Sequence, residues 1–246
     1  MTRTKAKHVV FDVVGTLVDF SAYISAIDRA IGPALRAETI TPQAFAHSWM
    51  TSAELEQTFL RISERPTPYR AVMTSTFYRT LILCGVQEPR KIATEEQREA
   101  CVQGYWDLTL RDGAKECLEI LRGAGFQTWF FTSSDLKRVQ GYFASAGVEV
   151  QEGSIISCAG SNPDRPVEKP LLGAYRPVLE GFGKDDVKWF AAAHMWDVSA
   201  AVKTGFKGAY CSAYEQEACL DIHGDTMEVM ADTLAEMAKK IVVTSD

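Results

Sequence analysis

The sequence predicts an α/β protein with one large sheet domain and an inserted helical unit. Apolar runs typical of buried strands alternate with helical segments at the start of the chain and again after residue 110. Between them, residues 19–108 have helical periodicity and no convincing strand. We therefore expect a doubly wound, Rossmann-like parallel sheet core formed by residues 1–18 and 109–246. A helical cap formed by residues 19–108 would be inserted after the first strand.

The first strand is predicted at residues 8–14, an apolar run that Gly15 ends. Four helices are expected in the cap, at residues 22–31, 41–63, 69–84 and 95–106. Gly32 and Pro33 are expected to stop the first of them, because proline disrupts a helix interior. Thr41 followed by Pro42 predicts the N-cap and first residue of the second.

Strands and helices alternate again in the second half of the chain. Strands are expected at residues 126–132, 153–158, 187–193 and 205–211. Helices are expected at residues 114–122, 136–147, 171–181, 198–204 and 232–241, the last with Asp232 as its N-cap. Residues 161–167 are interpreted as a polar loop. This order of units predicts strands that run parallel.

The composition is typical of a soluble globular protein, with 246 residues, 46% hydrophobic and 24% charged, and a net charge of −6. No apolar run reaches the roughly 18 residues of a membrane span, and the first residues lack a signal peptide's features. We therefore expect a cytoplasmic protein without a membrane partner. The absence of a basic stripe argues against nucleic acid. The six cysteines lack zinc spacing and are expected as free thiols.

Polar residues follow the carboxyl ends of several predicted strands, where open α/β sheets bind ligands. Asp12 ends the first strand, Thr132 and Ser133 end the next, and Asp197 follows a third. Lys169 lies in the loop before a predicted helix. Because Asp12 interrupts an apolar run, its carboxylate would be costly to bury unless it were paired or functional. Together these residues indicate an active site.

Each residue also has a purely structural interpretation. Asp12 could cap the following turn, and a lysine before a proline is usually solvated. His194 could be a satisfied polar residue, and Tyr175 and Trp196 could belong to the core. Only the combined pattern of these residues favours a catalytic role over these structural interpretations.

The joint pattern resembles that of the haloacid dehalogenase superfamily. Residues 11–17 (FDVVGTL) resemble its first motif, Thr132-Ser133 the second, Lys169-Pro170 the third and Trp196-Asp197 the fourth. The order and the spacing of these four motifs match the superfamily's pattern over nearly the whole chain. Within the superfamily, the L-2-haloacid dehalogenase branch is most similar, because it shares the spacing from Lys169 to Tyr175 and the Trp-Asp pair. Residues 55–61 also resemble that branch's cap helix.

The resemblance implies a metal-independent hydrolase that acts through a covalent aspartyl ester. Asp12 would attack an sp3 carbon in line and displace a leaving group, and water would then hydrolyse the ester. The residues expected to act catalytically are Asp12, Thr16, Lys169, His194 and Asp197. The residues expected to contact the substrate are Val14, Thr51, Thr132, Ser133, Tyr175 and Trp196. Lys169 would balance the charge of Asp12, and Asp197 with His194 would activate the water.

The metal-dependent phosphatases of the superfamily differ at two positions. They usually have a second Asp two residues after the nucleophile, where this chain has Val14. They also have an acid about four residues before the final Asp, where this chain has Ala193. Asp12, Asp197 and one backbone carbonyl make a poor cage for a hard cation. We therefore expect no cofactor, and Mg²⁺ only if the chain is a phosphatase after all.

Several positions depart from the dehalogenase pattern. The cap arginine that holds the departing halide aligns with Thr51, and Arg61 and Arg70 are the nearest substitutes. Further departures are Val14 for an aromatic residue, Ser133 for asparagine, and Ala192 and His194 for the Ser and Asn of the fourth motif. Removing a charged donor from a buried anion site should cost about 2–4 kcal/mol.

Three functional hypotheses follow. The first is a dehalogenase-like hydrolase of a small carboxylate, and the second is a magnesium-dependent phosphatase. The third is a non-hydrolytic role in binding or biosynthesis on the same scaffold, since fold alone does not determine function. All three imply a small-molecule partner, and a homodimer is possible because dimers are common among the relatives.

Overall fold

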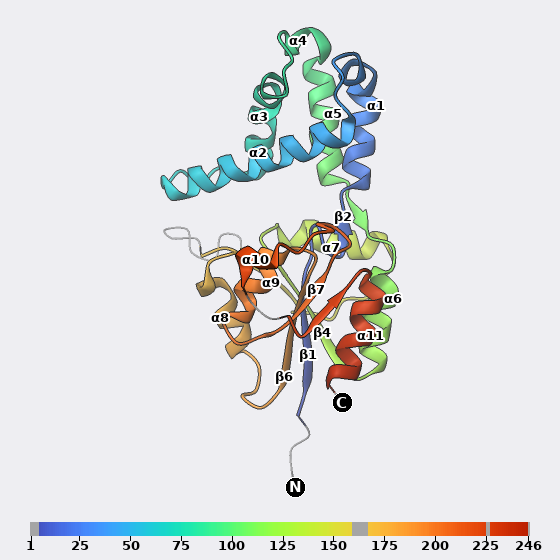
Figure 1. The fold of residues 1–246 in the computed structure, drawn as a ribbon, viewed down its shortest axis with the longest axis vertical. Helices are drawn as coiled ribbons and strands as arrows, with labels where there is room; N and C mark the ends of the chain where they lie inside the picture. Colours follow the sequence, from blue (N-terminus) through green and yellow to red (C-terminus); the bar gives the residue numbers. More distant parts are fainter. Residues whose placement is uncertain (1–4, 159–166, 225–226, 246) are drawn as a thin grey trace. The chain divides into compact units, whose positions relative to one another are not determined.

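A parallel sheet is the centre of the α/β unit in this computed structural model, which describes residues 5–158, 167–224 and 227–245 (Figure 1). Within the described residues, this sheet has six strands in the order β5-β4-β1-β6-β7-β8. Their bounds are β1 (Lys7–Asp12), β4 (Phe126–Thr132), β5 (Ile155–Ser157), β6 (Val187–Ala192), β7 (Lys207–Cys211) and β8 (Val229–Ala231). The order reverses between β1 and β6, which confirms the predicted doubly wound, Rossmann-like sheet.

Helices cover both faces of this sheet (Figure 1). On one face α6 (Ala114–Gly123) packs against α11 (Leu234–Ser245), and on the other α8 (Leu172–Glu180) packs against α9 (Met195–Val202). Two further helices are α7 (Leu136–Ser145), which contacts β5, and the single turn α10 (Leu220–His223). Val10, Phe131 and Phe190 form one buried cluster with residues of α8 and α9. Their strand neighbours Phe11, Phe130 and Ala191, which point to the opposite face, are buried as well, so the central strands are covered on both sides.

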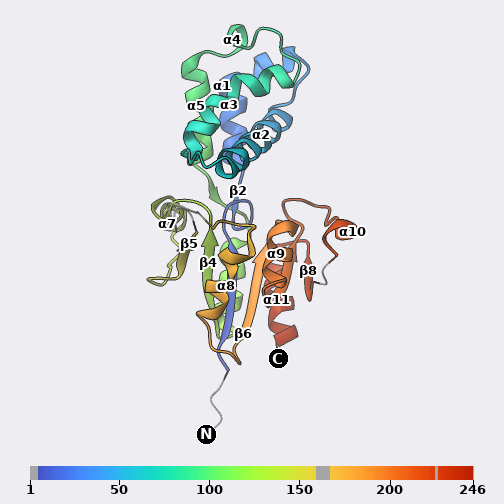
Figure 2. The same ribbon diagram turned by 90° about the vertical axis from the view of Figure 1, so that its left-hand side faces the viewer.

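The chain divides into two compact units. The α/β unit contains the residues up to Asp19 and from Thr109 onward, and the helical unit is Phe20–Leu108. The helical unit consists of α1 (Ser21–Ala37), α2 (Pro42–Ile62), α3 (Tyr69–Leu83), α4 (Pro89–Ile92) and α5 (Glu95–Trp106), which pack on one another (Figure 2). The chain leaves and re-enters the α/β unit through an antiparallel pair, β2 (Val18–Asp19) and β3 (Thr109–Leu110).

An aromatic core holds the helical unit together. Tyr23, Phe45, Trp49 and Phe77 are at most 1% exposed, and the ring centroids of Trp49 and Phe77 are 4.9 Å apart. Burying each such side chain contributes roughly 1.5–3 kcal/mol. Thr41 caps α2, because its hydroxyl accepts a hydrogen bond from the amide of Ala44 at 3.1 Å. The predicted N-cap is therefore confirmed.

The predicted end of the first helix is wrong, because α1 continues through Gly32 and Pro33 to Ala37. Pro33 removes one backbone donor from the helix. Ile31 and Leu35, on either side of it, are at most 1% exposed, so packing outweighs the lost hydrogen bond.

The last helix also starts later than predicted, at Leu234. Thr233, and not Asp232, accepts a hydrogen bond from the amide of Glu236, at 3.2 Å. Helix α9 begins at Met195, three residues before its predicted start, so Asp197 lies in its first turn. Strand β8 and the single turns α4 and α10 were not predicted, because three or four residues are too few to show a period.

The polar loop predicted at residues 161–167 lies, except for Val167, outside the described residues. Within the described ranges, no helix combines the length and the apolar character that crossing a membrane would require.

Candidate active site

The carboxylate of Asp12 lies at the carboxyl end of the central strand β1 and is almost fully buried. Its Oδ1 atom accepts a hydrogen bond from Lys169 Nζ at 2.9 Å, and its Oδ2 atom accepts one from Thr16 Oγ1 at 2.7 Å. The Thr16 hydroxyl in turn accepts a hydrogen bond from the amide of Ala193 at 2.8 Å. Both oxygens of Asp12 therefore have fixed donors, and these donors come from different segments of the chain.

Lys169 bridges two buried carboxylates. Its Nζ atom lies 2.9 Å from Asp12 Oδ1 and 2.6 Å from Asp197 Oδ2. It also lies over the rings of Phe131 and Phe190, 4.9 and 5.2 Å from their centroids, where the ring faces attract a cation. Burial lowers the pKa of Lys169, but the negative charges of Asp12 and Asp197 outweigh burial and raise it above its ordinary value. The site therefore contains a permanent cation.

Asp197 is fully buried in the first turn of α9, a favourable place for an anion. Its Oδ2 atom accepts from Lys169 and its Oδ1 atom accepts from the hydroxyl of Tyr175. Burial raises the pKa of Asp197, while Lys169 opposes the rise and the charge of Asp12 adds to it. Burial also raises the pKa of Tyr175 far above its ordinary value, so this phenol remains a neutral donor. Two acids thus share one cation.

His194 immediately precedes α9 and faces three acceptor groups. Its Nε2 atom lies 3.3 Å from the carbonyl oxygen of Val14 and 4.0 Å from Asp12 Oδ2. Its Nδ1 atom lies 3.5 Å from Glu215 Oε1. Burial lowers the pKa of His194, but Glu215, Asp12 and Asp197 outweigh burial and raise it above its ordinary value. His194 thus joins the loop after Asp12 to a carboxylate outside the predicted set.

Arg111 fixes the loop that follows Asp12. Its guanidinium donates to the carbonyls of Gly15 at 2.8 Å, Thr16 at 2.9 Å and Ala213 at 3.1 Å. Ala213 precedes Tyr214 and Glu215 in the turn after β7. One side chain from the end of the β2–β3 pair therefore connects the loop after Asp12 with the turn that carries Glu215.

The hydroxyls predicted at the end of β4 lie beside strand β1, which ends at Asp12. Asp12 pairs with Phe131, the residue before Thr132. The Thr132 hydroxyl accepts a hydrogen bond from the amide of Ser134 at 3.0 Å, and the Ser133 hydroxyl lies 3.4 Å from the sulfur of Cys158. These contacts hold the turn in shape, and the substrate contacts of Thr132 and Ser133 stay predictions.

The remaining predicted site residues have different surroundings. Trp196 is 39% exposed, and its ring centroid lies 5.4 Å from that of His194. Thr51 is exposed on α2 of the helical unit, so its assignment also stays a prediction. Arg70, one of its expected substitutes, donates to Glu99 and to Gln103 within the same unit.

Sequence reasoning missed Glu215 and Arg111. Glu215 lies four residues after the end of β7, and the rule that led to Asp12 and Asp197 applies equally to this strand end. Extending it to the turn after Cys211 would have identified Glu215. No comparable signal exists for Arg111, because an arginine two residues before a glycine usually belongs to an ordinary solvated turn.

Comparisons with known proteins agree with this geometry. The family model described as haloacid dehalogenase-like hydrolase matches residues 6–201. A search of curated protein sequences found no match. The L-2-haloacid dehalogenase of Xanthobacter autotrophicus is 21% identical with a TM-score of 0.71, and the alignment covers 96% of this chain and 98% of that one.

Two more solved structures are similar. One L-2-haloacid dehalogenase is 15% identical with a TM-score of 0.74, and the match covers 96% of this chain and 98% of the other. A dehalogenase with an intermediate complex is 17% identical with a TM-score of 0.72, over 96% of both chains. At these identities the likeness shows the fold.

Proposed function

The chain belongs to the haloacid dehalogenase-like hydrolases, and from that premise we propose that it displaces a leaving group from a small carboxylate without a metal. The observation that carries this proposal is the environment of Asp12. Thr16 and Lys169 hold its two oxygens, and Lys169 balances its charge. A carboxylate that is oriented in this way is suited to attack carbon.

The first chemical step is a displacement at an sp3 carbon. One oxygen of Asp12 forms a bond to that carbon, and the leaving group departs with the electron pair of the bond that breaks. The product is an ester on Asp12. The dehalogenase of Xanthobacter autotrophicus has been solved with chloropropionic acid covalently bound, and its shared fold supports this route.

The second step is hydrolysis of the ester. A water molecule attacks Cγ of Asp12, so the enzyme carboxylate keeps one oxygen from water and the product alcohol keeps one from Asp12. Asp197 is held by Tyr175 and Lys169, and His194 lies on the other side of Asp12. These two groups are the bases nearest to Asp12 among the proposed catalytic residues.

A magnesium ion does not fit this donor set. Its ligands would be oxygens of Asp12 and Asp197 and the carbonyl of Val14. Those oxygens already face Thr16, Lys169, Tyr175 and His194. Among the described residues, no group of three or more His, Cys, Asp or Glu side chains is arranged to hold a metal. The proposed mechanism therefore has no metal step.

Halide release by EDTA-treated protein tests the proposal. The panel is a set of short L-2-haloacids, with Asp12→Asn as the matched variant. We expect release by the wild type and none by the variant. In water enriched in ¹⁸O, a single turnover should label Asp12 itself, which peptide mass spectrometry detects. Halide release by Asp12→Asn at the wild-type rate, or activity only on phosphate esters with added magnesium, would overturn the proposal.

A further inference from the structure

Both ring nitrogens of His194 face groups that can only accept hydrogen bonds. Nε2 lies 3.3 Å from the carbonyl oxygen of Val14, and Nδ1 lies 3.5 Å from a carboxylate oxygen of Glu215. A neutral imidazole carries one N–H and would direct a lone pair at one of these oxygens. Only an imidazolium, with a proton on each nitrogen, can donate to both.

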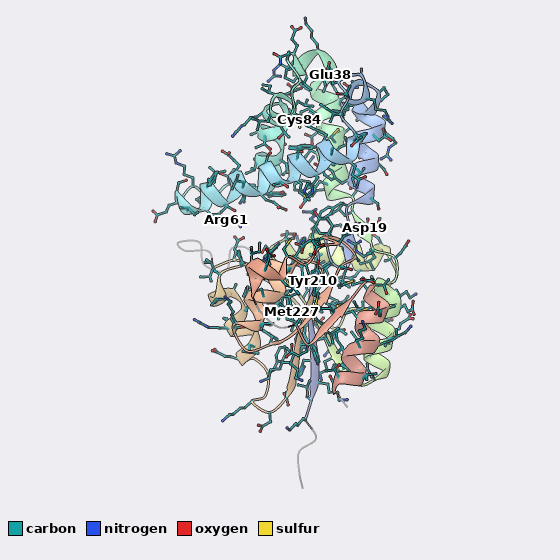
Figure 3. The ribbon with its side chains drawn as sticks, in the orientation of Figure 1. Asp19, Glu38, Arg61, Cys84, Tyr210 and Met227 are labelled. Carbon is teal, nitrogen blue, oxygen red and sulfur yellow. The ribbon has the colours of Figure 1, made fainter. Side chains whose placement is uncertain are left out.

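Glu215 is itself firmly held. Its Oε2 atom accepts a hydrogen bond from the amide of Met195 at 2.8 Å and lies 3.4 Å from the hydroxyl of Tyr210 (labelled in Figure 3). Its Oε1 atom faces the histidine ring. The pKa of Glu215 is raised by burial, but its hydrogen bonds with His194 and with the Met195 amide reverse the shift and leave the pKa below its ordinary value. Glu215 is thus an oriented anion beside the imidazole.

We propose that Glu215 is a positioning residue that keeps His194 protonated in the resting site, and that formation of the ester on Asp12 releases this proton and leaves His194 as the base for hydrolysis. The base role rests on the function proposed above. The protonation of His194 and its dependence on the charge of Asp12 do not rest on that function. Both follow from the geometry of the site before any reaction.

The charges around His194 explain the coupling. Asp12 faces it from the end of β1 and Glu215 from the turn after β7. Their charges, together with that of Asp197 in α9, stabilise the imidazolium. The ammonium of Lys169, on the far side of Asp12, opposes them. An ester on Asp12 removes a full negative charge 4.0 Å from Nε2, in a site that water screens poorly. The remaining anions hold the proton less tightly.

Atoms and protons balance over the cycle. In the first step Asp12 loses its charge to the ester bond, the leaving group departs as an anion, and His194 releases one proton to solvent. In the second step neutral His194 takes a proton from the attacking water. The alkyl oxygen takes the second proton of that water and leaves as an alcohol, and Asp12 returns to a carboxylate, so His194 ends protonated as it began. The sum is substrate plus water giving an alcohol, the leaving anion and one proton.

The first test needs no substrate. The chain has four histidines, so NMR of protein labelled in its histidine rings, assigned with His194→Asn, can follow each titration. We expect His194 to titrate above its ordinary pKa of 6.5 in the wild type. Its pKa should fall by about one pH unit or more in Asp12→Asn, which removes the charge as the ester does, and in Glu215→Gln. A wild-type pKa at or below 6.5, or no change in Asp12→Asn, would overturn the inference.

The second test separates the two half-reactions in rapid-quench experiments. Glu215→Gln keeps an acceptor for the Met195 amide but loses the negative charge beside His194. We expect a halide burst of one equivalent at the wild-type rate, then turnover slower by roughly 10–100-fold, with the ester accumulating on Asp12 in mass spectra. Glu217→Gln is the matched control, because this exposed glutamate lies two residues further along the same turn.

The outcomes distinguish the inference from the proposed function. Equal slowing of burst and turnover in Glu215→Gln, or slowing of neither, would overturn the positioning role. Absence of halide release by the wild type would refute the proposed function. In that case the NMR titrations still confirm or overturn the link between Glu215, His194 and Asp12.

Discussion

A Cβ atom added to Gly15 would lie 2.2 Å from Nε2 of His194. The backbone of Gly15 also has a φ of +90°, a conformation that other residues rarely adopt. The glycine in the loop after Asp12 therefore makes room for the imidazole, in addition to turning the chain. The loop after Asp12 and the histidine ring therefore fit together because residue 15 has no side chain.

Gly15→Ala should remove most of the activity while the protein stays folded. The methyl group must displace His194, and the left-handed backbone adds a strain of about 1–2 kcal/mol. We expect kcat to fall by roughly 10²–10⁴-fold, as for loss of a general base. Gly125→Ala is the matched control, since Gly125 has a φ of +82° and a methyl group added there would meet no atom within 4 Å. Equal losses of kcat in both variants would mean that strain alone is responsible.

Lys169→Met should destabilise the fold more than an ordinary lysine substitution. Methionine leaves the carboxylates of Asp12 and Asp197 buried with their shared cation gone. Breaking a buried ion pair in this way costs about 3–5 kcal/mol. Urea unfolding measures this loss, and Lys239→Met, at an exposed lysine, should change the free energy of unfolding by less than about 0.5 kcal/mol. A similar loss of unfolding free energy in the two variants would contradict the interpretation that Lys169 balances the two buried carboxylates.

Tyr175→Phe should affect both stability and chemistry. Phenylalanine keeps the packing of the ring against Phe131 and Phe190 but leaves Asp197 Oδ1 without its donor. A buried acceptor without its partner costs roughly 1–3 kcal/mol. We expect a lower melting temperature and slower hydrolysis of the ester. A variant with wild-type stability and wild-type ester hydrolysis would show that the Tyr175 hydroxyl does not support Asp197.

His8, which is buried, and His194, which is partly buried, should influence stability with opposite pH dependence. The pKa of His194 in the folded chain is above 6.5, so its contribution is present below that pH and is lost as pH rises through the folded pKa. Burial lowers the pKa of His8 despite its contact with Asp186, so its contribution is present above 6.5 and is lost as pH falls through the folded pKa.

Urea unfolding of wild type, His194→Asn and His8→Gln between about pH 5 and pH 8 measures these contributions. The difference in unfolding free energy between wild type and His194→Asn should shrink as pH rises. The difference between wild type and His8→Gln should grow. Slopes of the same sign would refute one of the two assignments.

Local signals in the sequence were enough to predict most of the longer strands and helices in their order along the chain. The apolar run before Asp12 predicts a buried strand, and Thr41-Pro42 predicts a helix start, because both depend on residues a few positions apart. The end of α1 could not be predicted in this way. Its continuation past Pro33 depends on the burial of Ile31 and Leu35 by helices that are distant in sequence.

The contacts within the site were decided by tertiary structure. Lys169 is 157 residues from Asp12 and 28 from Asp197, and only the strand order β4-β1-β6 brings these side chains together. Glu215 has no motif around it, and it meets its partner His194 only because β6 and β7 pair side by side. A residue's type and its place along a strand are local properties that a sequence records. The distance between two charged groups depends on the packing of the whole sheet. That distance influences the pKa of each group, and hence whether the group is protonated.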